Sequence, residues 1–210
     1  GKLIKVYPEI KHAKHCIAIF ASGAGSNAKK IIEYFSQSPN ISVSLIVCNN
    51  AEAGVLKIAA HYHIPAIILD KEKFFRGNCY TDELKEAQID LIVLAGFLWK
   101  IPALLVKVFA GKIINIHPAL LPKYGGKGMY GRHVHEAVIA AGEKVSGITI
   151  HYVDELYDHG KNIFQAVCHV SSGETPDTLA ARIHMLEHAH YSKVIEDILL
   201  NTGYITHHIN

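Results

Sequence analysis

Short, almost continuous runs of apolar residues alternate along the first half of the chain with segments in which apolar residues recur every three or four positions. A continuous run indicates a strand buried on both faces of a sheet, and the second pattern indicates an amphipathic helix. The expected strands occupy residues 16–22, 42–49, 64–70, 89–97 and 111–117. The expected helices between them occupy residues 28–38, 53–63, 80–88 and 102–110. This alternation predicts an α/β fold, a doubly wound and mostly parallel sheet with helices on both faces.

The pattern changes after residue 118. Residues 118–131, "PALLPKYGGKGMYG", form a glycine-rich loop, and loops of that length inside a domain usually have a function. A helix is expected next, then two strands that pair as an antiparallel edge near the C-terminus, and finally one long helix. These elements are expected at residues 132–142, 147–153, 162–170 and 175–200. We therefore expect one domain at 16–200, an N-terminal extension at 1–15 and a C-terminal tail at 201–210.

Charge and composition exclude several classes of protein. The chain has 210 residues, 21 of them basic and 19 acidic, and no basic stripe of the kind that binds nucleic acid. No apolar run is long enough to cross a membrane. The missing basic stripe and the short apolar runs together mean that neither nucleic acid nor a membrane is an expected partner. The four cysteines are scattered without a CxxC pair, which favours a reducing, cytoplasmic location. The 15 histidines lack neighbouring clusters of carboxylates or cysteines, so no metal site is expected.

The stretch "SGAGSN" (22–27) follows the first expected strand and precedes the first expected helix. Glycines allow a tight turn, and the free N–H groups at the start of a helix attract an anion such as a phosphate. The stretch is not a complete dinucleotide motif, because Ala28 replaces its third glycine. The second strand also ends in Asn49 and Asn50 rather than an acid. A phosphate site is therefore expected, and a dinucleotide cofactor is not.

The fifth expected strand ends in Asn115, Ile116 and His117, directly before a proline. Residues two apart on a strand point to the same side, so Asn115 and His117 are expected to project together into a ligand cleft. An amide can donate to an oxyanion, and an imidazole can act as acid or base near neutral pH. The loop 151–160 offers Asp154, Glu155 and Asp158 as partners that would keep His117 protonated, and spacing does not choose among them.

The stretches "FASGAGSN", "LIVLAGF", "INIHPALLPKY" and "DHG…IFQA" occur in the order and spacing of the phosphoribosylglycinamide formyltransferases, within the folate-dependent formyltransferase family. The resemblance covers about residues 16–198. It implies a Rossmann-like formyltransferase fold and a catalytic trio of Asn115, His117 and Asp158. It also implies a glycinamide ribonucleotide site and a folate site. The former comprises Gly25, Ser26, Asn27 and Glu187; the latter comprises Arg76, Leu98, Trp99, Lys100, Ile101 and Asn115.

Further positions match family residues near the site. His133 and His135 match two histidines of the mobile loop and the helix after it, and Thr149 matches a small hydroxyl residue. Trp99 departs from the family, which commonly has arginine there, and Lys100 is the candidate to supply that cation.

The activity implied by the resemblance is transfer of the formyl group from 10-formyltetrahydrofolate to the amine of N1-(5-phosphoribosyl)glycinamide, in de novo purine (IMP) biosynthesis. The folate is a co-substrate, and no tightly bound cofactor is expected. The expected partners are these small molecules, with the chain as monomer or homodimer. Two relatives share the trio: methionyl-tRNA formyltransferase, expected to have a basic surface and a further C-terminal domain, and formyltetrahydrofolate hydrolase, expected to have an N-terminal regulatory domain. A noncatalytic nucleotide-binding module is the alternative from a different class.

Overall fold

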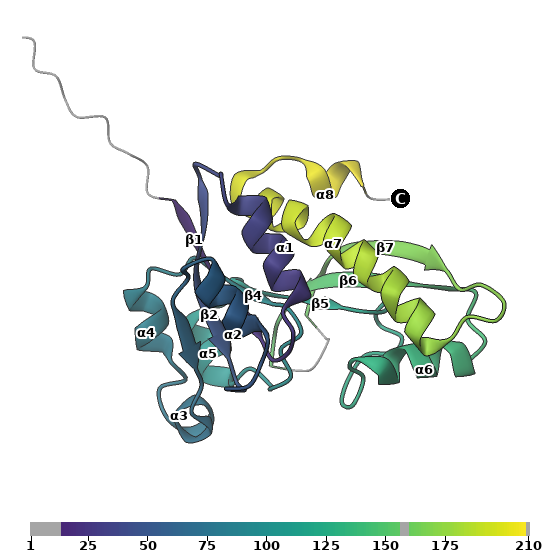
Figure 1. Ribbon diagram of the computed structural model, residues 1–210, viewed down its shortest axis with the longest axis horizontal. Helices are drawn as coiled ribbons and strands as arrows, with labels where there is room; N and C mark the ends of the chain where they lie inside the picture. Colours follow the sequence, from purple (N-terminus) through teal and green to yellow (C-terminus); the bar gives the residue numbers. More distant parts are fainter. Residues whose placement is uncertain (1–13, 156–159, 209–210) are drawn as a thin grey trace, which may run out of the picture.

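The computed structural model describes residues 14–155 and 160–208. Its centre is one seven-stranded sheet in the order β3-β2-β1-β4-β5-β6-β7 (Figure 1). The strands are β1 (His15–Ala21), β2 (Ile41–Cys48), β3 (Ala66–Ile68), β4 (Leu91–Leu94), β5 (Ile113–His117), β6 (Val145–Tyr152) and β7 (Asn162–His169). The pairs from β3 to β5 are parallel, and β6 and β7 are antiparallel. The predicted fold class, including its antiparallel edge, is confirmed.

Helices cover both faces of the sheet, as the alternating pattern predicts. They are α1 (Ser26–Phe35), α2 (Val55–His61), α3 (Lys71–Arg76), α4 (Thr81–Glu86), α5 (Ala103–Val108), α6 (Arg132–Ala140), α7 (Pro176–Leu200) and α8 (Tyr204–His207). One core lies beneath α1, α2, α6 and α7, and the other lies beneath α3, α4 and α5. Along β1, Ile17 and Ile19 belong to the first core, whereas Ala18 and Phe20 belong to the second. A strand buried on both faces needs apolar residues at every position, which explains the continuous run.

Two short helices were not expected from the sequence. In α3, Asp70 caps the amino end by accepting a hydrogen bond from the Lys73 N–H at 2.9 Å. Phe74 then anchors this helix in the core, where its side chain is fully buried. The other helix, α8, lies in the segment expected to be a C-terminal tail. The Asp197 carboxylate accepts hydrogen bonds there from the N–H groups of Gly203 and Ile205, at 2.9 and 2.8 Å.

The strands β3, β4 and β5 are shorter than the apolar runs that predicted them, whereas β1 and β2 have the expected lengths. β4 covers only Leu91–Leu94, because the chain turns away at Gly96, whose φ of +72° suits a residue without a side chain. Among the described residues, no helix is long and apolar enough to cross a membrane.

Candidate active site

The predicted catalytic pair lies at the carboxyl end of β5, near the centre of the sheet. Ile114 and Ile116 belong to the core beneath α1 and α7. Because side chains alternate along a strand, Asn115 and His117 project to the other side of β5. Asn115 is partly buried and His117 is 3% exposed. The carboxyl ends of β1 and β4 lie at the same edge, which is where open α/β sheets bind ligands.

Both side chains have defined hydrogen-bond partners. The His117 Nε2 atom lies 2.7 Å from the backbone oxygen of Tyr124, to which it donates, so the glycine-rich loop holds the imidazole. The Asn115 Nδ2 atom lies 3.1 Å from Nε2 of His151, which stands opposite Asn115 on the antiparallel neighbour β6. Asp158, the third member of the predicted trio, lies outside the described residues.

A cavity of about 70 Å³ opens beside Asn115. Three of the residues predicted to contact folate line it together with Asn115: Trp99, Lys100 and Ile101. The remaining lining residues are Leu94, Phe97, His151, Val153, Asp154 and Glu155. The cavity therefore has an aromatic wall, formed by Phe97 and Trp99, and its lining also contains the carboxylates of Asp154 and Glu155 and the Asn115 amide.

Two other residues predicted to contact folate do not line this cavity. Leu98 is 57% exposed, and its backbone N–H donates to the Ser22 hydroxyl at 2.9 Å. Arg76 lies in the last turn of α3, where its Nη1 atom is 3.5 Å from Oε2 of Glu72 in a solvent-exposed ion pair.

The helix α3 nevertheless contacts the cavity wall through two aromatic residues. The rings of Phe74 and Phe75 lie 5.7 and 5.2 Å from the Trp99 ring, measured between centroids. Phe97 packs edge-on against Phe74 at 6.0 Å. Trp99 therefore belongs to an aromatic group that includes both phenylalanines of α3.

The predicted phosphate loop lies at the amino end of α1. Gly25 adopts a φ of +80°, which L side chains rarely adopt, and a Cβ atom there would come within 2.8 Å of the Val55 side chain. Both the backbone conformation and the lack of space therefore favour glycine at this position. The Val55 N–H donates to the Gly23 oxygen at 3.1 Å and holds the loop against α2. Among the described residues, no side chain caps the amino end of α1, which begins at Ser26 and Asn27. Its first N–H groups are therefore suited to an anionic ligand.

Glu187, the acid predicted to meet the ribonucleotide, lies on α7 and is 5% exposed. It accepts a hydrogen bond from Nδ1 of His184 at 2.7 Å, which raises the pKa of that histidine. His135 on α6 is buried, and its pKa is lowered first by burial and then by the nearby His184. His117 also acts electrostatically on His135, so these groups extend from the end of β5 towards α7. His133 lies on the surface near Glu136.

Thr149 is fully buried and fastens the segment that follows His117. Its hydroxyl donates to the Ala119 oxygen at 2.7 Å and accepts from the Leu121 N–H at 3.0 Å. The Gln165 side-chain amide, on β7, donates to the same hydroxyl at 2.9 Å and to the Leu121 oxygen at 3.0 Å. The antiparallel edge therefore fixes where the glycine-rich loop begins.

Sequence reasoning missed three of these contacts: His151, His184 and Gln165. His151 and Gln165 meet their partners through the strand register, which the sequence does not specify, whereas His184 lies three residues from Glu187 on α7 and depends on the burial of that pair. The sequence does place His151 near the site, because His151 begins the stretch 151–160, whose acids are the candidate partners of His117. No comparable signal marked Gln165.

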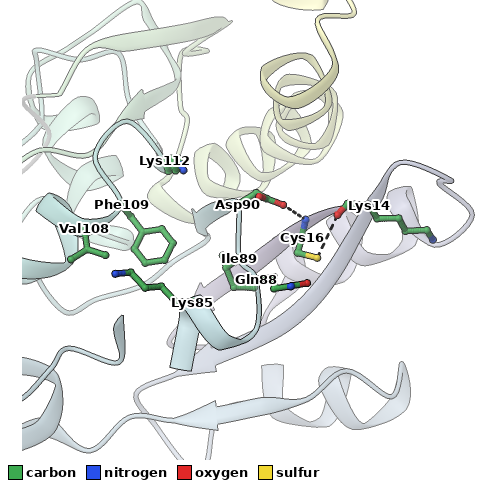
Figure 2. Close-up of a pocket in the computed structure, with 9 residues that line it drawn as sticks. All are labelled: Lys14, Cys16, Lys85, Gln88, Ile89, Asp90, Val108, Phe109 and Lys112. Atoms are coloured by element: carbon green, nitrogen blue, oxygen red, sulfur yellow. Dashed lines mark hydrogen bonds between the residues drawn. The ribbon is translucent and has the colours of Figure 1, made fainter. Parts of the chain in front are cut away.

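A larger cavity of about 420 Å³ lies at the opposite, amino end of the sheet (Figure 2). It is lined by Lys14, Cys16, Lys85, Gln88, Ile89, Asp90, Val108, Phe109 and Lys112. Its Asp90 carboxylate accepts from the Cys16 N–H at 2.8 Å and thereby ties β1 to the start of β4. None of the predicted site residues lies there, so cavity size does not identify the candidate active site. Within residues 14–155 and 160–208, no three or more His, Cys, Asp or Glu side chains are grouped to hold a metal ion.

Comparisons with known proteins agree with this geometry. Phosphoribosylglycinamide formyltransferase of Bacillus subtilis (strain 168) is 36% identical over 187 residues, which are 87% of this chain and 93% of that protein. The chloroplastic protein of the same name from Vigna unguiculata is 42% identical over 185 residues, covering 86% of this chain. The chain spans 59% of that relative and 63% of the corresponding Arabidopsis thaliana protein.

Solved structures show the same relationship. The phosphoribosylglycinamide formyltransferase of Anaplasma phagocytophilum superposes with a TM-score of 0.82 at 35% identity, covering 90% of this chain and 89% of that one. The protein of that name from Bacillus halodurans gives a TM-score of 0.79 at 35% identity, covering 90% and 98%. Residues 15–195 match the family described as formyl transferase. The chain therefore belongs to the formyl transferase family.

Proposed function

We propose that this protein is a phosphoribosylglycinamide formyltransferase, which transfers the formyl group of 10-formyltetrahydrofolate to the amine of glycinamide ribonucleotide in purine biosynthesis. The observation that carries the proposal is the placement of three features around one edge of the sheet. Asn115 and His117 end β5, a cavity with an aromatic wall opens beside Asn115, and, within the part of the chain that the structure describes, no side chain caps the amino end of α1 after the glycine loop. Names of relatives at 36–42% identity support the same reaction.

The chemistry assigned to these residues is acyl transfer through a tetrahedral intermediate. The substrate amine attacks the formyl carbon, a carbon–nitrogen bond forms, and the carbonyl oxygen becomes an oxyanion. Donors that are already positioned where this charge develops lower the barrier. We assign that role to the Asn115 amide and the protonated His117 imidazole. The intermediate collapses by breaking the bond between the carbon and N10 of the folate, and the proton lost by the amine ends on N10.

In this proposal the two substrates bind at different places along the carboxyl edge of the sheet. The ribonucleotide phosphate binds at Ser26 and Asn27, where the helix dipole favours an anion. Its glycinamide end extends towards Glu187. The folate lies in the cavity beside Asn115, with its rings against Trp99 and Ile101. Tetrahydrofolate leaves after each turnover, so the folate acts as a co-substrate and not as a resident cofactor.

The role of Asp158 rests on the sequence resemblance. A carboxylate beside an imidazolium favours its charged form, so Asp158 would hold His117 protonated at working pH. We further propose a cytoplasmic location and a monomer or homodimer, which the composition and the resemblance favour.

The test is an acceptor comparison. The purified protein is incubated with 10-formyltetrahydrofolate, and tetrahydrofolate release is measured with glycinamide ribonucleotide present or with water alone. We expect release to depend on the ribonucleotide and to be matched by formylated product. Equal release without the ribonucleotide would identify a formyltetrahydrofolate hydrolase, and no release in either case would leave the family fold without the proposed activity.

A further inference from the structure

His151 is a buried histidine with no role in the mechanism described above. It lies on β6 directly opposite Asn115, is 2% exposed, and shares the lining of the folate cavity with it. A buried polar ring beside the proposed oxyanion donor is costly unless its nitrogen atoms are satisfied. The partners of the two ring nitrogens therefore decide what the residue can do.

The two partners determine where the ring proton lies. Nδ1 of His151 is 2.9 Å from the backbone oxygen of Tyr152, and a carbonyl oxygen can only accept a hydrogen bond. Nδ1 must therefore carry the proton in this arrangement. An amide nitrogen can only donate, so a ring nitrogen that faces one at hydrogen-bond distance is an acceptor without a proton. The atom that faces Nε2, at 3.1 Å, is Nδ2 of Asn115, which has two N–H groups to offer.

We propose that His151, as the neutral Nδ1–H tautomer, is a positioning residue that fixes the side-chain amide of Asn115. An asparagine amide can rotate by half a turn and exchange its oxygen and nitrogen. A ring nitrogen without a proton repels the amide oxygen and attracts the amide N–H, so only one of the two orientations is stable against His151. The order of donors runs from the Asn115 amide to Nε2 of His151, and from Nδ1 of His151 to the Tyr152 oxygen.

The consequence for the reaction rests on the proposed function. One N–H of Asn115 Nδ2 is engaged by His151, and the second belongs to the same rigid amide plane. The oxyanion donor is thereby held in place before the substrate arrives. Preorganised donors avoid a reorganisation cost during the reaction, whereas a rotating amide would present its oxygen to the developing negative charge for part of the time. His151 acts through Asn115 and need not touch the substrate itself.

The first test measures the tautomer and does not require activity. Long-range ¹H–¹⁵N correlation spectra of histidine-labelled protein distinguish protonated from unprotonated ring nitrogens, and the His151→Gln variant identifies the His151 signals by their loss. We expect a protonated Nδ1 and an unprotonated Nε2 near neutral pH. A protonated Nε2, in either the other tautomer or an imidazolium, would overturn the proposal even if formyl transfer proceeds as proposed.

The second test is a double-mutant cycle on formyl transfer. His151→Leu should lower kcat by about 10- to 100-fold, the range typical of a mispositioned catalytic group, and change the KM for glycinamide ribonucleotide less than about twofold. In an Asn115→Ala background the same substitution should have no further effect on kcat, because the group it positions is gone. His151→Gln, whose side-chain oxygen can accept from Asn115, should recover part of the loss. Equal losses in both backgrounds would overturn the proposal, because His151 would then act independently of Asn115.

Discussion

Replacing Thr149 by valine removes one buried hydroxyl and changes the shape of the side chain very little. The lost hydroxyl makes three hydrogen bonds, at 2.7, 3.0 and 2.9 Å, and Thr149 is fully buried. A net contribution of about 1 kcal/mol for each bond, with the buried Leu121 N–H left unpaired, gives a loss of about 2–4 kcal/mol. For a chain of this size that loss corresponds to a fall in Tm of about 4–16 °C.

Thermal unfolding of Thr149→Val and Thr149→Ser, each followed by circular dichroism, measures this loss. Serine keeps the hydroxyl and loses one buried methyl group, which costs about 1 kcal/mol. Because Ala119 and Leu121 closely follow His117, the valine variant should also show a lower kcat at temperatures well below its Tm. A valine variant at least as stable as the serine variant would refute the assignment of the hydroxyl as the fastening group.

Three further predictions concern the substrate sites. Ser26→Asp should raise the KM for glycinamide ribonucleotide far more than the KM for the folate, because the new carboxylate repels a phosphate at the start of α1; an equal effect on both would show that the loop is misassigned. Glu187→Gln should lower the pKa of His184 in an NMR titration, because the hydrogen bond to Glu187 raises it. A raised histidine pKa stabilises the fold below the unfolded value of about 6.5, and that stabilisation is lost as pH rises through the folded pKa, so the parent and not the variant should lose stability over this window. Trp99→Ala should raise the KM for the folate on the order of tenfold and leave that for the ribonucleotide nearly unchanged; the reverse pattern would remove Trp99 from the folate site.

Much of the fold was predictable because its signals are local. A strand buried on both faces must be apolar at every position, so the runs around Ile19 and Val93 could only be central strands or buried helices, and their length favoured strands. The exact ends were less predictable, since β4 stops where Gly96 turns the chain. The helix α3 escaped prediction because its six residues are too few for a periodic pattern, although Asp70 is a typical capping residue.

The residues of the candidate site also fall into two groups, those that local sequence signals reveal and those that depend on tertiary structure. Asn115 and His117 could be found because strand alternation and the following proline mark them within one short stretch. His151 and Gln165 could not be found, because their partners depend on the antiparallel register of β5, β6 and β7, which the sequence does not specify. The hydrogen bond between His184 and Glu187 is local, because the two residues lie three positions apart on α7. The burial of Glu187 depends on the packing of α7 against α6, which the sequence does not show.

The most direct test of the central claim follows the formyl carbon itself. A single-turnover reaction with ¹³C-formyl-labelled 10-formyltetrahydrofolate and glycinamide ribonucleotide is recorded by ¹³C NMR for the parent and for His117→Ala. We predict that the label appears on the ribonucleotide amine in the parent, and that the rate falls about 100-fold or more in the variant while its fold is retained. Label found only as free formate, or transfer at the parental rate by His117→Ala, would contradict the account.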